Sequence, residues 1–397
     1  MSGRAATDAA CPACDAIGMD VFHEQDGVPA HSVLLLPSRD EALGYPTGDL
    51  RLGFCRSCGF ISNLAFDVAL NEYSQRCEET QGFSPHFRAW LRGLAEGFVD
   101  RYDLRGRDVL EIGCGKGEFL ALVCELGAGR GTGIDPAYVP DRLESEAADR
   151  LTFITELYSE AYGHLVGDAV ACRHTLEHIA PVAEFVRTVR RSLADRDDVI
   201  VFFELPETLR VLREIAFWDI YYEHCSYFTP GSLTRLFRRE GFDPIDLRLD
   251  YADQYVLLDT RPGTGRGPQL PLEDDLAETA RLVDHFRRVF PERVEELAAT
   301  IRAVHAGDGH TVIWGAGSKG VAFLTTLGVS EDEIEYAVDI DPYKQGMFMA
   351  GTGQEIVAPA FLADYRPDLV LVMNPVYTDE IGRELESMGL APKVVAV

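Results

Sequence analysis

The chain has 397 residues, which exceeds one typical domain of roughly 150 residues, so more than one hydrophobic core is expected. Its composition, 46% hydrophobic and 26% charged, is that of a folded protein, and no apolar run reaches the roughly 18 residues that a membrane span needs. Its 37 basic and 65 acidic side chains give a net charge of −28, which disfavours nucleic acid and membrane partners because no basic patch is evident.

The first segment, residues 1–80, is predicted to be a small metal-binding domain. Its first eight residues lack the apolar run of a secretory signal, so we expect a cytoplasmic protein. The short extended stretches that follow are expected to form only a small hydrophobic core. Two CxxC pairs, 40 residues apart, supply four thiolates: Cys11, Cys14, Cys55 and Cys58. Such a set predicts a closed, structural Zn²⁺ site, with unrelated buried thiols or a redox CxxC as the alternatives.

Residues 81–262 alternate between predicted helices and strands. Apolar residues spaced by three and four predict a helix over 84–103. Strands are predicted at 108–112, 131–135, 168–171 and 199–203, and a further helix at 181–193. This alternation indicates an α/β fold with a parallel, doubly wound sheet.

A second, smaller α/β domain is predicted for residues 272–397. The preceding segment, 261–271, is rich in glycine and proline and is therefore assigned as the domain boundary. A charged helical stretch follows from 272 to 304, and we expect Pro291 to interrupt it. Strands at 311–314, before Asp339 and at 368–373 complete the prediction.

A glycine-rich turn follows the first strand of the central domain. Its residues are Glu111, Gly113, Cys114, Gly115 and Gly117, and Asp135 ends the next strand 24 residues after Glu111. A carboxylate in that place suits the ribose hydroxyls of a nucleoside, and no phosphate-gripping P-loop ending is present. The pattern resembles class I S-adenosylmethionine (SAM) methyltransferases. A dinucleotide site and a purely structural turn are the alternatives.

The C-terminal domain contains a second glycine motif after a strand. Gly315, Gly317, Ser318 and Lys319 fit GxGxxG, and Asp339 ends the next strand. Alone, the motif suggests bound NAD(P) and an oxidoreductase. The domain is short for a full dinucleotide site, and Lys319 suggests a clamp for a phosphate of the substrate. We therefore expect these four residues to bind a substrate nucleotide, with a structural role as the alternative.

Ionisable and aromatic residues are concentrated in residues 218–228. His224 is a candidate general base because imidazole titrates near neutrality, Glu223 could orient or tune a neighbour, and Tyr221 could stabilise an oxyanion. The alternative is an aromatic cluster that packs two domains together. His178 follows the fourth strand, where ligands bind in doubly wound sheets; His174 would share its helical face, and together they could hold a metal.

The order of these three parts resembles the SAM-dependent C-methyltransferases of nucleotide-linked deoxyketosugars. That family has an N-terminal zinc domain, a class I methyltransferase domain and a C-terminal Rossmann-like domain. Residues 220–224, Ile-Tyr-Tyr-Glu-His, resemble the family's Tyr-x-Glu-His, and residues 176–179 resemble its Leu-x-His-Ile. The resemblance implies the active-site residues Tyr73, His178, Tyr221, Glu223 and His224, with the histidine of the first motif as base.

The resemblance implies C-methylation of a small acceptor beside a ketone, through an enolate, with SAM and structural zinc as cofactors. The residues after Tyr73 and after His224, and the residues 317–320, depart from the family pattern where an acceptor would touch the protein. The resemblance therefore applies to the class of reaction more than to the identity of the substrate. Methylation of a non-sugar acceptor, N- or O-methylation, an NAD(P)-dependent oxidoreductase and a non-catalytic scaffold remain alternatives, and the sequence does not indicate the oligomeric state.

Overall fold

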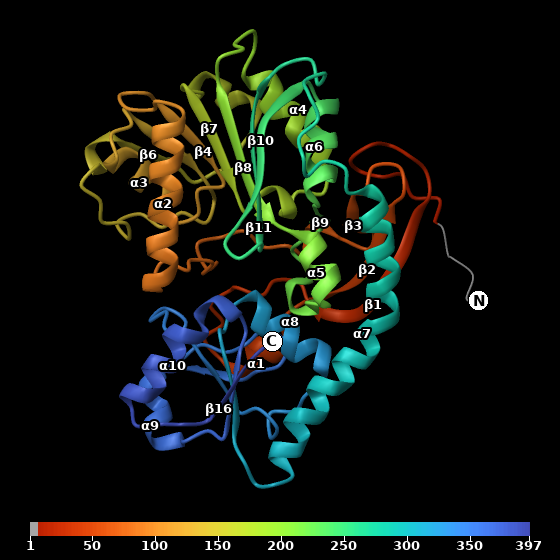
Figure 1. Cartoon of the computed structure of the whole chain (residues 1–397). Coiled ribbons are helices and arrows are strands. Elements are labelled where there is room, and N and C mark those ends of the chain that lie inside the picture. Colours follow the sequence, from red (N-terminus) through yellow and green to blue (C-terminus); the bar gives the residue numbers. More distant parts are fainter. Residues whose placement is uncertain (1–6) are drawn as a thin grey trace.

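The computed structural model describes residues 7–397, which form three β-sheets (Figure 1). Residues 1–6, on which the expectation of a cytoplasmic protein partly depends, lie outside the described residues. Across residues 7–397 we find no helix with the length and apolar character needed to cross a membrane.

The first sheet is antiparallel and lies near the N-terminus of the chain, beside α1 (Arg39–Leu43). Its strands, in spatial order, are β1 (Met19–Pro29), β2 (Thr47–Cys55), β3 (Ile61–Asn63) and β9 (Ser226–Tyr227). The last of these comes from the segment that also carries His224, so a strand far along the sequence completes this sheet. Ile61 pairs with Tyr227, and Ser62 pairs with Ser226.

The central sheet has seven strands and confirms the predicted α/β class. Their order is β10 (Phe242–Asp250), β11 (Tyr255–Pro262), β8 (Ile200–Pro206), β7 (Ala169–Arg173), β4 (Val109–Ile112), β5 (Gly131–Ile134) and β6 (Leu151–Ile154). The five strands from β8 to β6 are parallel, whereas β10 and β11 add an antiparallel edge.

Helices cover both faces of the central sheet. They are α2 (Pro85–Arg101), α3 (Glu118–Glu125), α4 (Val182–Ser192) and α6 (Pro230–Arg239), whereas α5 (Thr208–Glu214), which follows β8, packs in a separate core with the later helix Leu276–His305. The apolar residues of α2 and α3 pack with Phe202, and those of α4 and α6 pack with Phe203 on the opposite face. The α2 helix confirms the prediction for residues 84–103, because Ser84 caps its first turn and Pro85 occupies a position that needs no N–H donor.

The third sheet is fully parallel. Its strands are β14 (Glu355–Val357), β13 (Tyr336–Val338), β12 (Thr311–Trp314), β15 (Leu369–Val372) and β16 (Lys393–Ala396). The helices of this part are α8 (Ser318–Leu327), α9 (Leu362–Tyr365) and α10 (Thr378–Ser387).

The long helix α7 (Leu276–His305) runs along the outside of the molecule between the central and third sheets (Figure 1). The predicted interruption at Pro291 is wrong, because the 30-residue helix continues through it. Buried side chains on both sides of the proline, Phe286 before it and Leu297 and Ile301 after it, keep both halves packed. Tertiary packing therefore offsets the loss of one backbone hydrogen bond.

The first and third sheets share one hydrophobic core. Phe22, Leu52 and Phe54 of the first sheet belong to the same buried cluster as Phe286 of α7 and Phe323 of α8. Burial of a shared apolar surface therefore supports the N-terminal sheet in addition to any metal. The sequence did not indicate this shared core.

Candidate active site

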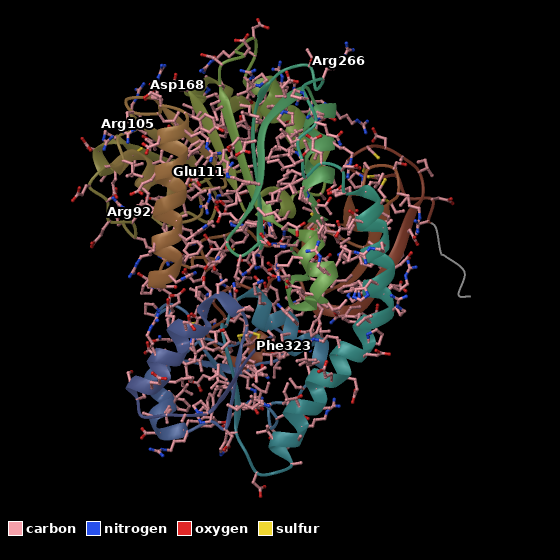
Figure 2. The ribbon with its side chains drawn as sticks, in the orientation of Figure 1. Arg92, Arg105, Glu111, Asp168, Arg266 and Phe323 are labelled. Carbon is pink, nitrogen blue, oxygen red and sulfur yellow. The ribbon has the colours of Figure 1, made fainter. Side chains whose placement is uncertain are left out.

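A cavity of about 1190 Å³ lies between the central and third sheets and reaches the N-terminal segment. It is lined by the loops that follow β4, β5, β7, β12 and β13, which places it at the carboxyl ends of parallel strands. Glu111 of β4 lies in the interior, whereas Asp168, before β7, lies at the opposite edge of the central sheet (Figure 2). Ligands bind at the carboxyl edge in folds of this class.

The glycine loop after β4 forms one wall of this cavity. Gly113, Gly115 and Gly117 have backbone φ values of 70°, 52° and 85°, which residues other than glycine rarely adopt. A Cβ atom on Gly113 would come within 1.8 Å of Thr175 Oγ1, so the close approach of the two loops requires glycine there. Cys114 is buried and lines the same cavity.

Asp135 and Glu111 supply carboxylates to this wall. The two oxygens of Asp135 accept hydrogen bonds from the Gly115 N–H at 2.8 Å and the Ala137 N–H at 2.7 Å. Glu111 is 2% exposed, and its Oε2 has no hydrogen-bond partner. Burial raises the pKa of Glu111 to about 8, although the positive charge of Arg173 opposes this rise. A buried, unpartnered carboxylate oxygen calls for a donor that the protein does not supply.

The five predicted catalytic residues all line the same cavity as the glycine loop. Four of their rings form a continuous series: Tyr73 lies 5.5 Å from His178, His178 lies 4.6 Å from His224, and His224 lies 4.1 Å from Tyr221, measured between ring centroids. Because Tyr73 belongs to the N-terminal segment, three distant stretches of sequence meet here.

Both histidines are neutral at pH 7. Burial lowers the pKa of His178 and lowers that of His224 well below the ordinary value. His178 Nδ1 lies 3.0 Å from the carbonyl oxygen of Glu223. A carbonyl can only accept, so Nδ1 carries the proton and Nε2 of His178 has a free lone pair. A neutral imidazole can take a proton at once, as a general base must.

The Glu223 carboxylate is turned toward the N-terminal segment. Its Oε1 accepts hydrogen bonds from the Ser32 N–H, at 3.1 Å, and from the Ser32 hydroxyl. His31 Nδ1 lies 3.9 Å from the same oxygen. Burial raises the pKa of Glu223 to about 7, and the Ser32 hydrogen bonds oppose that rise.

The expectation that His174 and His178 share a helical face is wrong. His174 lies in a turn with φ of 45°, before the short 3-10 segment Leu176–His178. Its Nε2 is 2.7 Å from Glu204 Oε1, and contacts with Glu177 and Glu204 outweigh the effect of burial and raise its pKa to about 9. His178 is instead grouped with Glu177 and His224, whose ligand atoms lie within 4.8 Å of one another.

The second glycine motif faces the cavity from the third sheet. Gly315, with φ of 117°, Gly317 and Ser318 line it together with Lys319. Lys319 Nζ forms an ion pair with Asp219, which also binds Arg210, so the lysine has a carboxylate partner at the place where we expect a substrate phosphate. Arg210 also pairs with Glu214, so the two cations of this wall stand against two carboxylates.

Asp339 repeats the arrangement of Asp135 at the second motif. Its oxygens accept hydrogen bonds from the Ala316 N–H and the Asp341 N–H, each at 2.9 Å. In both α/β units, the carboxylate that ends the second strand thus holds the preceding glycine loop.

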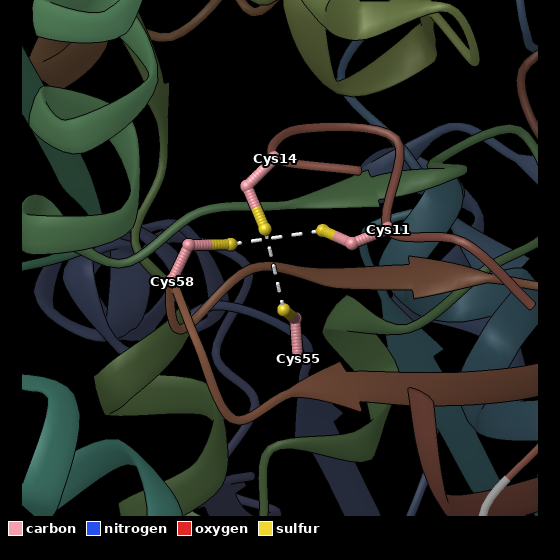
Figure 3. A group of neighbouring side chains, drawn as sticks. All are labelled: Cys11, Cys14, Cys55 and Cys58. Carbon is pink, nitrogen blue, oxygen red and sulfur yellow. Dashed lines mark hydrogen bonds between the residues drawn. The ribbon is translucent and has the colours of Figure 1, made fainter. Parts of the chain in front are cut away.

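The four paired cysteines converge at one point (Figure 3). The Cys11 and Cys58 sulfurs are 3.6 Å apart, as are those of Cys14 and Cys55, and none forms a disulfide. A tetrahedral zinc site with Zn–S bonds of about 2.3 Å separates its sulfurs by about 3.8 Å. The cluster is therefore compatible with a four-thiolate metal site.

Sequence analysis missed several residues of the cavity region: His31, Ser32, Glu177, Arg210 and Asp219. Glu177 lies within residues 176–179 and Asp219 within residues 218–228, two segments that the sequence identifies as candidate site segments. Their position there could have indicated them. Nothing local distinguished His31 and Ser32, because their partner Glu223 is 191 residues away from Ser32 along the chain.

Comparison with known proteins gives matches to both α/β parts. Residues 86–247 match a family described as a methyltransferase domain, and residues 273–391 match one described as a C-methyltransferase C-terminal domain. The C-methyltransferase NovU of Streptomyces niveus is 29% identical over 370 residues, which cover 87% of this chain and 85% of that protein.

Solved structures resemble the chain over less than half its length. A putative SAM-dependent methyltransferase from Listeria monocytogenes is 13% identical, with a TM-score of 0.32, over 43% of this chain and 99% of its own. Magnesium protoporphyrin IX methyltransferase from Synechocystis is 18% identical, with a TM-score of 0.35, over 45% of this chain and 84% of its own.

Proposed function

We propose that this chain, which belongs to the SAM-dependent C-methyltransferases, methylates a carbon beside the ketone of a nucleotide-linked deoxysugar. The observation that carries the proposal is a pair of adjacent neutral imidazoles, His178 and His224, in the cavity that the SAM-type glycine loop also lines. Carbon methylation requires a base beside the carbonyl, and this pair supplies one.

The residues around the first glycine loop fit SAM, a ligand with a sulfonium and an ammonium group. Three carboxylates border the loop: Glu79, Glu111 and Asp135. The cations beside them are occupied: Lys116 Nζ donates to the carbonyls of Cys77 and Ala137 and pairs with Glu79, and Arg173 pairs with Glu204. The unpartnered Oε2 of Glu111 thus favours a cationic ligand over a phosphate. Gly113, Cys114, Gly115 and Gly117 would hold its adenosine, with the ribose on Asp135.

In the proposed mechanism, SAM supplies an electrophilic methyl group. His224 takes the proton from the carbon beside the ketone, which leaves an enolate. Tyr221, whose pKa is raised well above the ordinary value by burial, keeps its proton and can donate a hydrogen bond to the developing negative oxygen. His178, whose Nε2 carries a lone pair, packs beside His224. The buried walls exclude water, and the positions of these side chains fix the geometry of transfer.

The second glycine motif supports a nucleotide-linked acceptor. Gly315, Gly317, Ser318 and Lys319 face the cavity across from the histidines, and Lys319 shares Asp219 with Arg210. We propose that these two cations meet the phosphates of the acceptor. Under this assignment residues 272–397 bind the nucleotide, and residues 81–262 bind SAM.

The four cysteines of residues 1–80 fit a structural zinc ion. Their sulfurs stand at separations close to those of a tetrahedral thiolate site, and a closed set of four ligands leaves no position for a substrate. We propose that zinc links the two CxxC turns and takes no part in the chemistry.

The test of the proposed function is incubation of the enzyme with methyl-deuterated SAM and a panel of nucleotide-linked 4-ketosugars, followed by mass spectrometry. We expect deuterium on a ring carbon of one sugar and equimolar S-adenosylhomocysteine. Label on an oxygen or nitrogen would replace C-methylation by O- or N-methylation. SAM binding without any labelled panel member would remove the sugar acceptor and leave the methyltransferase.

Replacement of Asp135 by alanine is expected to raise the Kd for SAM about 30-fold, because hydrogen bonds to a charged group are lost and the Gly115 N–H loses its acceptor. Isothermal titration calorimetry measures the change. Asp168→Ala is the matched control, since Asp168 also accepts a backbone N–H, from Asp108, but at the opposite edge of the sheet. Equal Kd values for the two variants would contradict the assignment of Asp135.

A further inference from the structure

The segment between β1 and α1 carries two buried polar side chains beside the cavity. His31 is 1% exposed, and Ser32 is 5% exposed. Leu34 bridges to Cys77, the Glu78 N–H donates to the Val33 carbonyl at 2.7 Å, and the Leu35 N–H donates to the Arg76 carbonyl at 3.0 Å. The segment is therefore anchored against residues 76–78, which follow Tyr73.

Ser32 is the hydrogen-bond donor of Glu223. Both its backbone N–H and its hydroxyl donate to Oε1 of Glu223, which is 1% exposed. Among residues 7–397, no lysine or arginine lies within ion-pair distance of this carboxylate. The ionisable groups that interact with it are His31, Tyr45, Tyr73, Tyr221 and Tyr227, and none of them carries a positive charge at pH 7. Within residues 7–397, both hydrogen bonds that Oε1 accepts thus come from Ser32, and His31 Nδ1 lies farther away, at 3.9 Å.

The second oxygen of Glu223 is left for a ligand. Oε2 is buried and has no hydrogen-bond partner, and Glu223 lines the cavity. The carbonyl of the same residue accepts the Nδ1 proton of His178. Glu223 therefore connects Ser32 on one side with His178 and the acceptor space on the other. A buried oxygen in this state is satisfied only when a donor enters the cavity.

His31 packs against Tyr73, another predicted active-site residue. Its ring lies edge-on to Tyr73 with the centroids 5.7 Å apart, its Nδ1 accepts from the Val33 N–H, and its Nε2 lies 3.7 Å from Cys77 Sγ. Burial lowers its pKa to about 3, so it is a neutral packing partner. The series of rings at the active site thus begins inside the N-terminal segment.

We propose that Ser32 is a positioning residue for methyl transfer: it fixes Glu223 Oε1 so that Oε2 faces a hydroxyl or amino substituent of the acceptor ring. This inference rests on the proposed function for the identity of the acceptor. The contact between Ser32 and Glu223 is independent of the proposed function. The zinc-bearing segment then contributes to substrate orientation, and not only to the stability of the chain.

The first measurement follows the Glu223 carboxyl directly. The full-length protein is labelled with ¹³C at the glutamate side-chain carboxyl, and the Glu223 signal is assigned by its loss in Glu223→Gln. Hydrogen bonds from Ser32 favour the charged form, so removing the hydroxyl in Ser32→Ala should raise the titration midpoint by about one pH unit. Ser32→Thr keeps a hydroxyl and should restore the midpoint.

The second measurement separates orientation of the acceptor from folding. We expect Ser32→Ala to raise KM for the acceptor about tenfold while the Kd for SAM stays unchanged. The matched control is Ser62→Ala, because Ser62 is also a buried serine of the N-terminal sheet and its hydroxyl has no partner. A merely structural effect of losing a buried hydroxyl would move the two alanine variants together.

The outcomes are distinct. An unchanged titration of Glu223 in Ser32→Ala, or an equal shift in Ser62→Ala, would overturn the positioning role whatever the enzyme methylates. A shifted titration restored by threonine supports the contact. If that shift is seen while no ketosugar is methylated, the contact between Ser32 and Glu223 stands and the acceptor of the proposed function falls.

Discussion

Replacement of His224 by alanine should lower turnover about 10³-fold and leave the Kd for SAM nearly unchanged, which is the largest effect we expect at the site. General-base catalysis by a positioned side chain contributes about 10² to 10⁴-fold. His224 is buried beside His178 and Tyr221, and no hydrogen bond to the glycine loop involves it. Single-turnover transfer of deuterated methyl to the acceptor measures the chemical step separately from SAM binding.

Two comparisons make the assignment of His224 specific. Exogenous imidazole should restore part of the activity of His224→Ala, since the deleted side chain leaves space for a small base. His164→Gln, on the surface away from the cavity, should behave like the unaltered enzyme. Full turnover in His224→Ala, or a parallel loss of SAM affinity, would assign the base elsewhere.

Loss of the metal cluster should have the second largest effect, on stability and activity together. Cys58→Ala is expected to release zinc and to lower the free energy of unfolding of the N-terminal segment by several kcal/mol, since binding energy of a structural zinc is folding energy. The cluster is linked to the active site through β3, which follows Cys58 and pairs with β9 two residues beyond His224. A small displacement there should reduce turnover about 10²-fold.

The cysteine prediction has a control in the same chain. Cys124→Ala also removes a buried thiol, from α3 outside the cluster. Zinc content by mass spectrometry, thermal unfolding and methyl-transfer rate are compared for the two variants. Retention of one zinc ion by Cys58→Ala, or equal loss of stability in Cys124→Ala, would contradict a four-thiolate site.

Local patterns predicted the parts of the site that are close together in sequence. The glycine loops follow strands whose apolar runs are short and unbroken, so Gly113 and Gly315 could be placed at strand ends from the sequence alone. His178 could be placed after a predicted strand, and His224 lies in a segment that is too polar for a hydrophobic core. Tyr73 was different: only the family resemblance suggested it, because its own neighbourhood has no periodic pattern.

Contacts between distant segments could not be predicted from one sequence. The Ser32 contact with Glu223, the pairing of β9 with β3 and the ion pair of Lys319 with Asp219 each join residues that are far apart in the sequence. The predictions at Pro291 and His174 were wrong for a related reason. Local propensity favoured a helix break at Pro291, but packing keeps the helix continuous. A helix was expected at His174, but its contact with the buried Glu204 holds it in a turn.

The shared core has a consequence for synthesis of the chain. The first sheet lacks its fourth strand until residues 226–227 have been made, and its apolar face lacks Phe286 and Phe323 until α7 and α8 have emerged. The residues of the first sheet therefore leave the ribosome before the elements that complete their packing. Until then, their apolar surface stays exposed to chaperones and to other nascent chains, and a ribosome-bound chain ending before α8 should be sensitive to protease within residues 7–80.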